Sequence, residues 1–175
     1  MGTGDAVKCG MNEVKDADKV LVLYGDVPLI KEKTLKELIN SCNEGISILT
    51  TVLDQPHGYG RVKKDNDGNA TAIIEEKDTR DDEKNIKEIF TGVLCSQTDL
   101  LKDGLSKINN DNAAGEFYLT DIVSIMSDKG IKIKTHVASN EEVKGANSHS
   151  ELAELEGIYR SMKVQDILDM GITVS

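Results

Sequence analysis

The distribution of apolar residues divides the first third of the chain into a strand, a helix and a second strand. Residues 19–24 (KVLVLY) are almost continuously apolar, which is typical of a strand buried on both faces. In residues 31–42 (KEKTLKELINSC) the apolar positions recur at helical spacing, and residues 45–54 (GISILTTVLD) read as a second β-rich strand. The order strand, helix, strand predicts a βαβ unit and therefore a largely parallel sheet.

The middle of the chain has the pattern of a hairpin followed by a longer strand. Residues 61–64 and 70–75 can pair across a turn at residues 65–68 (DNDG). Residues 89–96 (IFTGVLCS) predict another strand, and residues 98–108 (TDLLKDGLSKI) predict a short amphipathic helix.

The next segment predicts a helix and a half-exposed strand. Apolar positions between Ile122 and Met126 indicate a helix that stops at Gly130. Residues 131–138 (IKIKTHVA) alternate apolar and polar side chains, as a strand with one exposed face does.

A long helix is predicted over residues 148–171, where Ser148 and Glu151 can form a capping box. Its apolar stripe consists of Leu152, Leu155, Tyr159 and Met162. We expect this stripe to pack against the core or against another domain rather than to bind a ligand.

Length and charge restrict the class of protein. The chain has 175 residues, enough for one domain or slightly more, and no apolar run approaches the ~20 residues needed to cross a bilayer. The first residues show no basic region followed by an apolar one, so no signal peptide is expected. A net charge of −10 without a basic stripe argues against nucleic acid as a partner, and no membrane partner is expected. An anionic small molecule can still be held by local cations, backbone N–H groups or a metal.

The cysteines and histidines add two further expectations. Cys9, Cys42 and Cys95 are odd in number and far apart, which is typical of free thiols in a reducing cytoplasm. The three histidines include no close pair, so a zinc site is not expected.

Asp26 follows the first strand at the position where open α/β sheets bind ligands. Gly25 removes a side chain just before it, and Pro28 stiffens the chain just after it. Spacing alone leaves two interpretations open. Asp26 either holds a divalent cation that in turn holds phosphates, or caps the turn or the following helix.

Six short motifs occur in a fixed order along the chain: YGDVPLI, GYGR, IIEEKD, TGV, GEFYLTD and VKGAN. Together they resemble the uridyltransferase domain of the bacterial bifunctional N-acetylglucosamine-1-phosphate uridyltransferase / glucosamine-1-phosphate acetyltransferase family. That family has patterns such as GTGHA, LYGDVPL, GYGRI, IVEHKDA, EINTGI, GEYYLTD and VxGVNNR. The resemblance runs from Gly2 to nearly the end of the chain.

The resemblance implies an α/β, Rossmann-like sugar nucleotidyltransferase fold, with a mostly parallel mixed sheet and flanking helices. It implies the formation of UDP-N-acetylglucosamine and pyrophosphate from UTP and N-acetylglucosamine 1-phosphate. This is a cytoplasmic step toward peptidoglycan and cell-wall biogenesis, with Mg²⁺ as the cofactor. The sugar phosphate would attack the α-phosphorus of UTP, a reaction that needs positioning and charge neutralisation more than a covalent nucleophile.

The resemblance assigns the metal and the catalytic role to Asp26 and Asn147. Asp26 matches the magnesium-binding Asp of the family's GD, and Asn147 matches the Asn that shares the metal. A carboxylate and an amide oxygen, completed by phosphate and water, suit Mg²⁺. Without the fixed order of the six motifs, Asn147 would be interpreted as an ordinary loop residue.

Four residues match the family's contacts to the uracil nucleotide: Gly2, Thr3, Tyr24 and Gly25. Gly2 and Thr3 match backbone and hydroxyl contacts, while Tyr24 and Gly25 match the segment beside the uridine and the metal. Taken alone, the GTG sequence would be a flexible terminus.

Four others match positions around the N-acetylglucosamine moiety: Gly60, Glu75, Tyr118 and Thr120. Glu75 could accept hydrogen bonds from sugar hydroxyls, and Gly60 would allow close approach. The alternatives are a turn glycine for Gly60, a solvated charge for Glu75, a packed aromatic for Tyr118 and a helix cap for Thr120. Arg61 is expected to be a surface or ion-pair residue.

Two positions depart from the family pattern. Phe90 stands where the family's EINTG has an Asn that contacts the sugar, and Phe cannot supply those hydrogen bonds. Losing such a partner can cost on the order of 1–3 kcal/mol, so sugar selectivity is in question. Asp5 stands where the family's GTGHA has its usual His, and we expect this difference to matter little for the function.

The family begins with a Gly-rich loop of the form LAAGxGTxM and a Lys, which nothing in this sequence matches. The resemblance therefore implies an N-terminally truncated fragment missing the first strands and the Gly-rich loop. Residues 1–149 would be the C-terminal part of the nucleotidyltransferase domain, and residues 150–175 a helix leading toward an absent β-helix domain. The isolated chain is expected to be weakly active or inactive.

Two alternatives to this function stay open. The chain could be a non-catalytic module that binds a sugar phosphate or another protein, or a nucleotidyltransferase for a different sugar 1-phosphate. A homo-oligomer and pairing with a missing N-terminal half are both compatible with the sequence.

Overall fold

The computed structural model describes residues 1–173. Its α-helices are α1 (Thr3–Gly10), α2 (Glu32–Ser41), α3 (Thr98–Leu105), α4 (Asp121–Ser127) and α5 (His149–Asp169). Its strands are β1 (Lys19–Val22), β2 (Ile46–Val52), β3 (Arg61–Lys64), β4 (Ala70–Ile74), β5 (Glu88–Gln97) and β6 (Ile133–Val137). Short 3-10 helices cover Met11–Glu13, Cys42–Glu44, Glu76–Asp78 and Glu83–Asn85. The elements predicted from the apolar pattern are present, whereas α1 was not predicted.

The six strands form one mixed sheet in the order β4–β3–β5–β2–β6, with β1 paired to β5. Both Lys19 of β1 and Ile46 of β2 align with the end of β5, at Gln97 and Ser96, so β1 and β2 lie on opposite edges of this strand. They run in the same direction, as a βαβ unit requires, but β5 runs the other way between them. Within residues 1–173 only β2 and β6 pair in parallel, which corrects the expectation of a largely parallel sheet.

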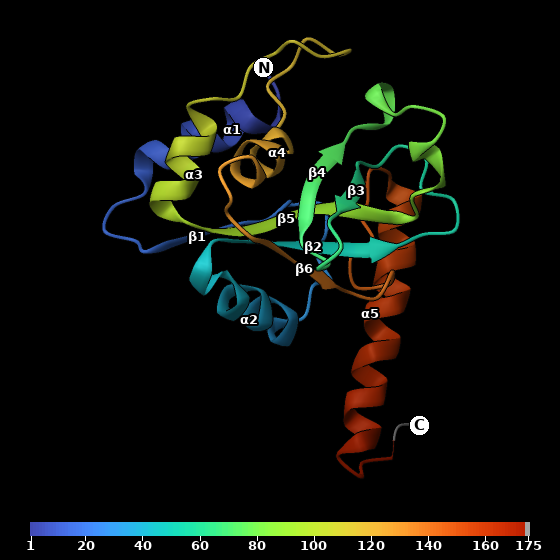
Figure 1. Cartoon of the computed structure of the whole chain (residues 1–175). Coiled ribbons are helices and arrows are strands. Elements are labelled where there is room, and N and C mark those ends of the chain that lie inside the picture. The colour runs from blue at the N-terminus through green and yellow to red at the C-terminus, as the bar shows by residue number, and fades with distance from the viewer. Residues whose placement is uncertain (174–175) are drawn as a thin grey trace.

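Helices cover both faces of the sheet, with α2 on one face and α1, α3 and α4 on the other (Figure 1). The core on the α2 face contains Leu38, Cys42, Leu49, Val93, Cys95 and Ala138. On the opposite face, Leu94 of β5 and Leu101 of α3 belong to a larger core with Ile122 and Met126 of α4. The flanking helices of the predicted α/β class are thus confirmed, because each buries an apolar stripe against the sheet.

The strand β1 is less buried than its apolar sequence predicted. All four of its residues are half-buried rather than buried. The reason is its position, because β1 is bonded only to β5 among the described strands and has no second neighbour.

The DNDG hairpin turn is confirmed. The Asp65 carboxylate accepts hydrogen bonds from the backbone N–H groups of Asp67 (3.0 Å) and Asn69 (2.8 Å). Gly68 has a φ of 82°, a conformation that glycine adopts without strain.

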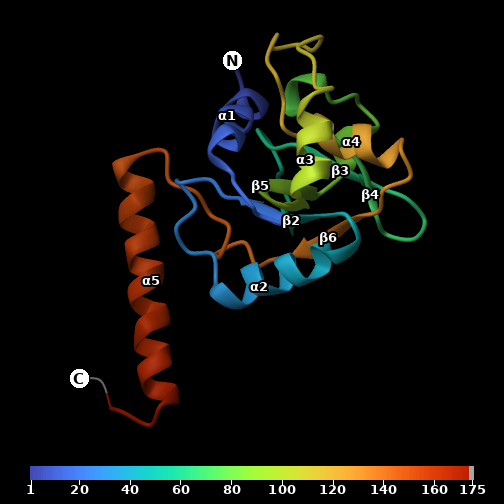
Figure 2. The same cartoon turned by 90° about the vertical axis from the view of Figure 1, so that its left-hand side faces the viewer.

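The helix α5 extends away from the body of the molecule (Figures 1 and 2). Leu155 is buried, but Leu152 and Tyr159 are 46% and 50% exposed. Of the expected apolar stripe, only Leu155 is fully buried and Met162 is half-buried, because the helix leaves the sheet after its first turns (Figure 1). Within residues 1–173, no helix is both long and apolar enough to span a membrane.

Candidate active site

A cavity of about 600 Å³ opens where β1 and β2 end and where β5 begins. Its walls also include residues 58–60 between β2 and β3, residues 116–120 before α4 and residues 140–147 before α5. This is the side of an open sheet where ligands bind, beyond the carboxyl ends of β1 and β2.

The two predicted metal ligands both line this cavity. Asp26 is exposed, and its backbone carbonyl accepts a hydrogen bond from the N–H of Ala146 (2.9 Å). This bond joins the segment after β1 to the loop that carries Asn147. In the described chain the Asp26 carboxylate makes no hydrogen bond, so it is available to a ligand.

The capping alternative for Asp26 is not supported by the geometry. The helix α2 begins after Lys31, which is its N-cap residue and has no side-chain cap. The Lys31 backbone N–H donates instead to Oε1 of the buried Glu142 (2.9 Å).

Asn147 is held in place by the start of α5. Its backbone N–H donates to Oε2 of Glu151 (2.7 Å), while the N–H of Glu151 donates to Oγ of Ser148 (3.2 Å). The predicted capping box is thus present, except that the Glu151 carboxylate bonds one residue before the N-cap. These bonds lower the pKa of Glu151, that to Asn147 being the main cause.

Of the four residues matched to the nucleotide, Thr3 and Tyr24 line the cavity and Gly2 and Gly25 do not. The N-terminal segment is not a free end, because Thr3 Oγ1 accepts a hydrogen bond from the N–H of Leu119 (3.0 Å). Gly2 packs against the backbone of Phe117, where an added Cβ would lie 2.6 Å from the carbonyl oxygen.

The ring of Tyr24 lies against Gly92 of β5. Gly92 has a φ of 87°, and a Cβ there would lie 2.4 Å from Cε2 of the ring. Burial raises the pKa of Tyr24, and a hydrogen bond with Thr3 acts in the opposite direction. The tyrosine thus stays neutral and forms a fixed wall beside Asp26.

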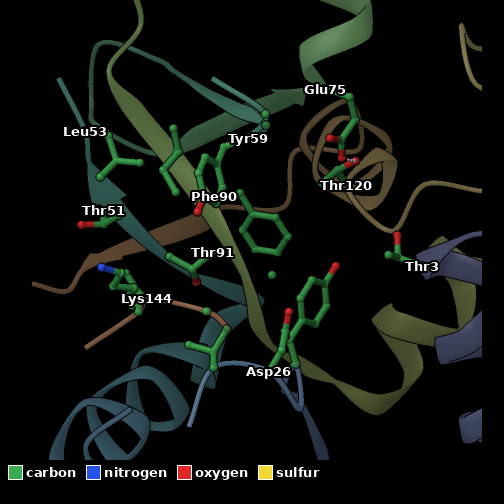
Figure 3. Close-up of a pocket in the computed structure, with 18 of the residues that line it drawn as sticks. Thr3, Asp26, Thr51, Leu53, Tyr59, Glu75, Phe90, Thr91, Thr120 and Lys144 are labelled. Atoms are coloured by element: carbon green, nitrogen blue, oxygen red, sulfur yellow. Dashed lines mark hydrogen bonds between the residues drawn. The ribbon is translucent and has the colours of Figure 1, made fainter. Parts of the chain in front are cut away.

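All four residues matched to the sugar line the cavity. The Thr120 hydroxyl donates to Oε1 of Glu75 (2.8 Å), which orients that carboxylate (Figure 3). Thr120 occupies the N-cap position of α4, but its side chain makes no cap bond, which corrects that alternative. A Cβ at Gly60 would lie 2.7 Å from Cγ2 of Ile73 and 3.6 Å from Oε2 of Glu75, so this wall has no room for a side chain.

Arg61 is a buried ion-pair residue. Its guanidinium bonds Oε2 of Glu76 (2.6 Å) and the carbonyl of Tyr59, and the same carboxylate oxygen accepts from the N–H of Gly58 (3.3 Å). The pair fixes the loop that carries Tyr59 and Gly60 into the cavity wall.

Several features of the cavity were not identified from the sequence. Leu53, Tyr59 and the ring of Phe90 form an apolar wall (Figure 3). Lys144 also lines the cavity, although the VKGAN motif drew attention only to its Asn.

Carboxylates gather near Tyr118. Burial raises the pKa of Tyr118, with Asp78 and Glu75 adding to the effect. Burial also raises the pKa of Asp121 to about 6, again with contributions from Glu75 and Asp78. No periodicity signals such a cluster, because its members come from separate elements.

Among the side chains that the structure describes, no group of three or more His, Cys, Asp and Glu residues is arranged to hold a metal ion. A metal at this cavity would therefore depend on Asp26 and an amide oxygen, with phosphate and water completing its shell.

The chain is similar to part of a set of bifunctional proteins. It is 42% identical to the bifunctional protein GlmU of Psychrobacter sp. (strain PRwf-1) over 98% of its length, and 40% identical to that of Dichelobacter nodosus over 99%. In both cases it spans 38% of the relative's length. No family model matches the chain.

Two solved structures share the fold. One is a nucleoside-diphosphate-sugar pyrophosphorylase from Vibrio cholerae RC9, with a TM-score of 0.64 and 14% identity, covering 88% of this chain and 64% of that chain. The other is CMP:2-keto-3-deoxy-manno-octonic acid synthetase complexed with CTP, with a TM-score of 0.61 and 16% identity, covering 91% of this chain and 68% of that chain. These likenesses confirm the nucleotidyltransferase-type α/β fold.

Proposed function

We propose, from its match to one region of the GlmU proteins, that this chain is part of a uridyltransferase. The reaction is the formation of UDP-N-acetylglucosamine and pyrophosphate from UTP and N-acetylglucosamine 1-phosphate. The observation that supports this most is the cavity itself. Its lining includes the candidate residues Asp26, Asn147, Gly60, Glu75, Tyr118 and Thr120, and the chain is 42% identical to a GlmU protein.

In this proposal the chain's residues bind and orient the sugar phosphate. Glu75, held by Thr120, accepts hydrogen bonds from sugar hydroxyls, and Gly60 lets the sugar approach the backbone. This orients the phosphate oxygen for in-line attack on the α-phosphorus of UTP, so that positioning supplies much of the catalysis.

Asp26 and Asn147 fit a magnesium ion. The Asp26 carboxylate has no competing hydrogen bond among the described residues, and the capping contacts of Asn147 use its backbone and leave its amide oxygen available. A hard cation that keeps several waters needs only one or two such protein ligands. When bound, the ion would neutralise charge on the phosphate oxygens.

A second candidate keeps the reaction and changes the sugar. The observation that favours it is Phe90, a residue that is 6% exposed and lines the cavity without offering any side-chain hydrogen bond. Calorimetric titrations with N-acetylglucosamine 1-phosphate, glucose 1-phosphate and N-acetylgalactosamine 1-phosphate distinguish the candidates. Tightest binding of the first supports the uridyltransferase above, and tighter binding of either other sugar supports the second candidate.

The variant Asp26→Asn tests the proposed metal site. We expect it to weaken Mg²⁺-dependent binding of N-acetylglucosamine 1-phosphate by about tenfold or more. Replacing even a residue that only supports a metal ligand typically lowers metal affinity or activity by about 10–100-fold. The melting temperature should be unchanged, because the Asp26 side chain is exposed. Glu141→Gln, which removes another exposed carboxylate, is the control. Undiminished Mg²⁺-dependent binding by Asp26→Asn would exclude this residue as the ligand.

We further propose that the protein acts in the cytoplasm, in the supply of a cell-wall precursor. The three cysteines are free, which fits a reducing compartment. Turnover by the chain alone is tested by pyrophosphate release from UTP and the sugar phosphate. We predict that the isolated chain is weakly active or inactive in this assay. A homo-oligomer and pairing with an N-terminal half also stay predictions.

A further inference from the structure

The charges around the cavity are unbalanced for an anionic substrate. Among the described lining residues, Asp26, Glu75 and Glu116 are acidic, and Lys144 is the one cation. A sugar 1-phosphate brings further negative charge, which a carboxylate-lined cavity disfavours unless a positive group is near.

Lys144 lines the cavity beside Asp26, the proposed ligand of the phosphate-binding metal. It adjoins Gly145, where an added Cβ would lie 3.7 Å from Oδ2 of Asp26. The next residue, Ala146, donates its N–H to the Asp26 carbonyl (2.9 Å). The lysine stem therefore starts from a backbone fixed against Asp26, and its four flexible carbons let the ammonium move.

In the structure the Lys144 ammonium is bonded to Glu154 of α5. The distance from Nζ to Oε1 is 2.5 Å, and the two side chains are 38% and 57% exposed. Ion pairs this exposed contribute little stability, so exchanging one for a phosphate costs little. The nearby Glu151 differs, because it binds the backbone of Asn147 and does not compete for the lysine.

We propose that Lys144 is a phosphate-binding residue of the cavity, and that it exchanges Glu154 for the phosphate of the sugar 1-phosphate. This inference rests on the proposed function. It assigns Glu154 the role of a competitor that holds the ammonium at the cavity rim while no substrate is bound. Removing the lysine and removing its partner should then change affinity in opposite directions.

The test is binding of N-acetylglucosamine 1-phosphate, with N-acetylglucosamine as the reference without phosphate, measured by calorimetry and saturation-transfer NMR in Mg²⁺. Lys144→Gln should weaken binding of the phosphorylated sugar by about five- to tenfold, as expected for one charge-assisted hydrogen bond, and leave the reference unchanged. Lys144→Arg should retain most of the affinity because it keeps the charge.

Glu154→Gln should tighten binding of the phosphorylated sugar by roughly twofold, because the ammonium is released from its partner. Glu156→Gln is the matched control, since it removes the same charge from the same helix and its carboxylate pairs with Arg160 instead. It should leave the affinity unchanged.

Three results would overturn the inference. Equal affinity of Lys144→Gln and the unchanged chain for the phosphorylated sugar would reject the phosphate contact while leaving the proposed function standing. Weaker binding by Glu154→Gln would show that the ion pair only supports the loop. Failure of the unchanged chain to bind either sugar would reject the proposed function and this inference together.

Discussion

Two residues of β5 shape the cavity in opposite ways. Phe90 fills part of it with a ring that is also part of the core. Gly92, two positions along, leaves space that the ring of Tyr24 occupies. Both residues line the same cavity.

Replacing Phe90 by Asn should change stability and selectivity together. We expect the free energy of unfolding to fall by about 3 kcal/mol, since Phe90 is nearly buried. The ratio of affinities for N-acetylglucosamine 1-phosphate over its 3-deoxy and 4-deoxy analogues should rise by about fivefold to tenfold, because an amide can bond a hydroxyl.

Urea unfolding and calorimetry measure the two effects. Phe90→Leu is the control, since it keeps an apolar side chain and should lower stability by only about 1 kcal/mol without altering the ratio. An unchanged ratio in Phe90→Asn would show that residue 90 does not face a sugar hydroxyl.

Replacing Gly92 by Ala should destabilise the protein by about 2–4 kcal/mol, because the added Cβ meets the Tyr24 ring in a backbone conformation that favours glycine. Gly157→Ala on α5 is the matched substitution, since nothing lies within 4 Å of its added Cβ. That change should raise stability by about 0.5–1 kcal/mol through helix propensity. Equal urea midpoints for the two variants would contradict the close packing of Tyr24.

At the scale of elements, α5 combines two roles. Its first two turns hold the loop of residues 140–147 through Glu151 and Glu154, both of which bond residues of that loop. Beyond Leu155 its side chains are largely exposed. The helix therefore contributes to the site through its start and contributes little to the core through its length.

Ser148→Ala should loosen this attachment. Loss of the N-cap hydroxyl costs about 1 kcal/mol of helix stability, and amide exchange in the first turn of α5 should accelerate. Mg²⁺-dependent binding of the sugar phosphate should also weaken, because a frayed first turn no longer holds Glu151 in place to bind the backbone of Asn147. Ser150→Ala, an exposed position in the same turn, is the control. Unchanged exchange rates would indicate that the cap does not fix the loop.

At the scale of the whole molecule, local patterning predicted most elements, because apolar periodicity records which face each one buries. The pattern did not reveal that β5 pairs with β1, β2 and β3, since strand neighbours depend on distant segments. Likewise, the motifs located Asp26, Glu75 and Asn147. The ion pair of Lys144 with Glu154 could not be predicted from them, because it depends on how the chain turns between the loop and α5. The helix α1 was missed because its glycines obscure an apolar face that includes Val7.

The stability of the whole molecule should depend on Asp121. Its pKa is raised to about 6 from an ordinary 3.8, so the folded state disfavours the charged form. Unfolding free energy therefore includes a penalty above pH 6 that disappears as the pH falls toward 4. Asp121→Asn should be more stable than the unchanged chain by on the order of 1 kcal/mol at pH 7.5, the effect being reduced by solvent screening.

Urea unfolding at pH 4.5, 6.0 and 7.5 measures this difference, which should fall at pH 4.5 to about a third of its value at pH 7.5, because most unfolded chains still carry the charge at pH 4.5. Comparing the two chains at each pH removes the effects of the other carboxylates. A difference of the same size at all three values would show that Asp121 is not the titrating group.

The central position of β5 determines when the chain can fold. Among the described strands, β1 and β2 find their first partner only when residues 88–97 have left the ribosome, whereas the β3–β4 hairpin can form its pairs earlier. The described part of the sheet therefore closes late, because the pairs of β5 with β1 and β2 join residues that lie 36 to 78 positions apart in sequence. Until then, the apolar residues of β2 stay exposed, which makes the nascent chain a natural client for chaperones.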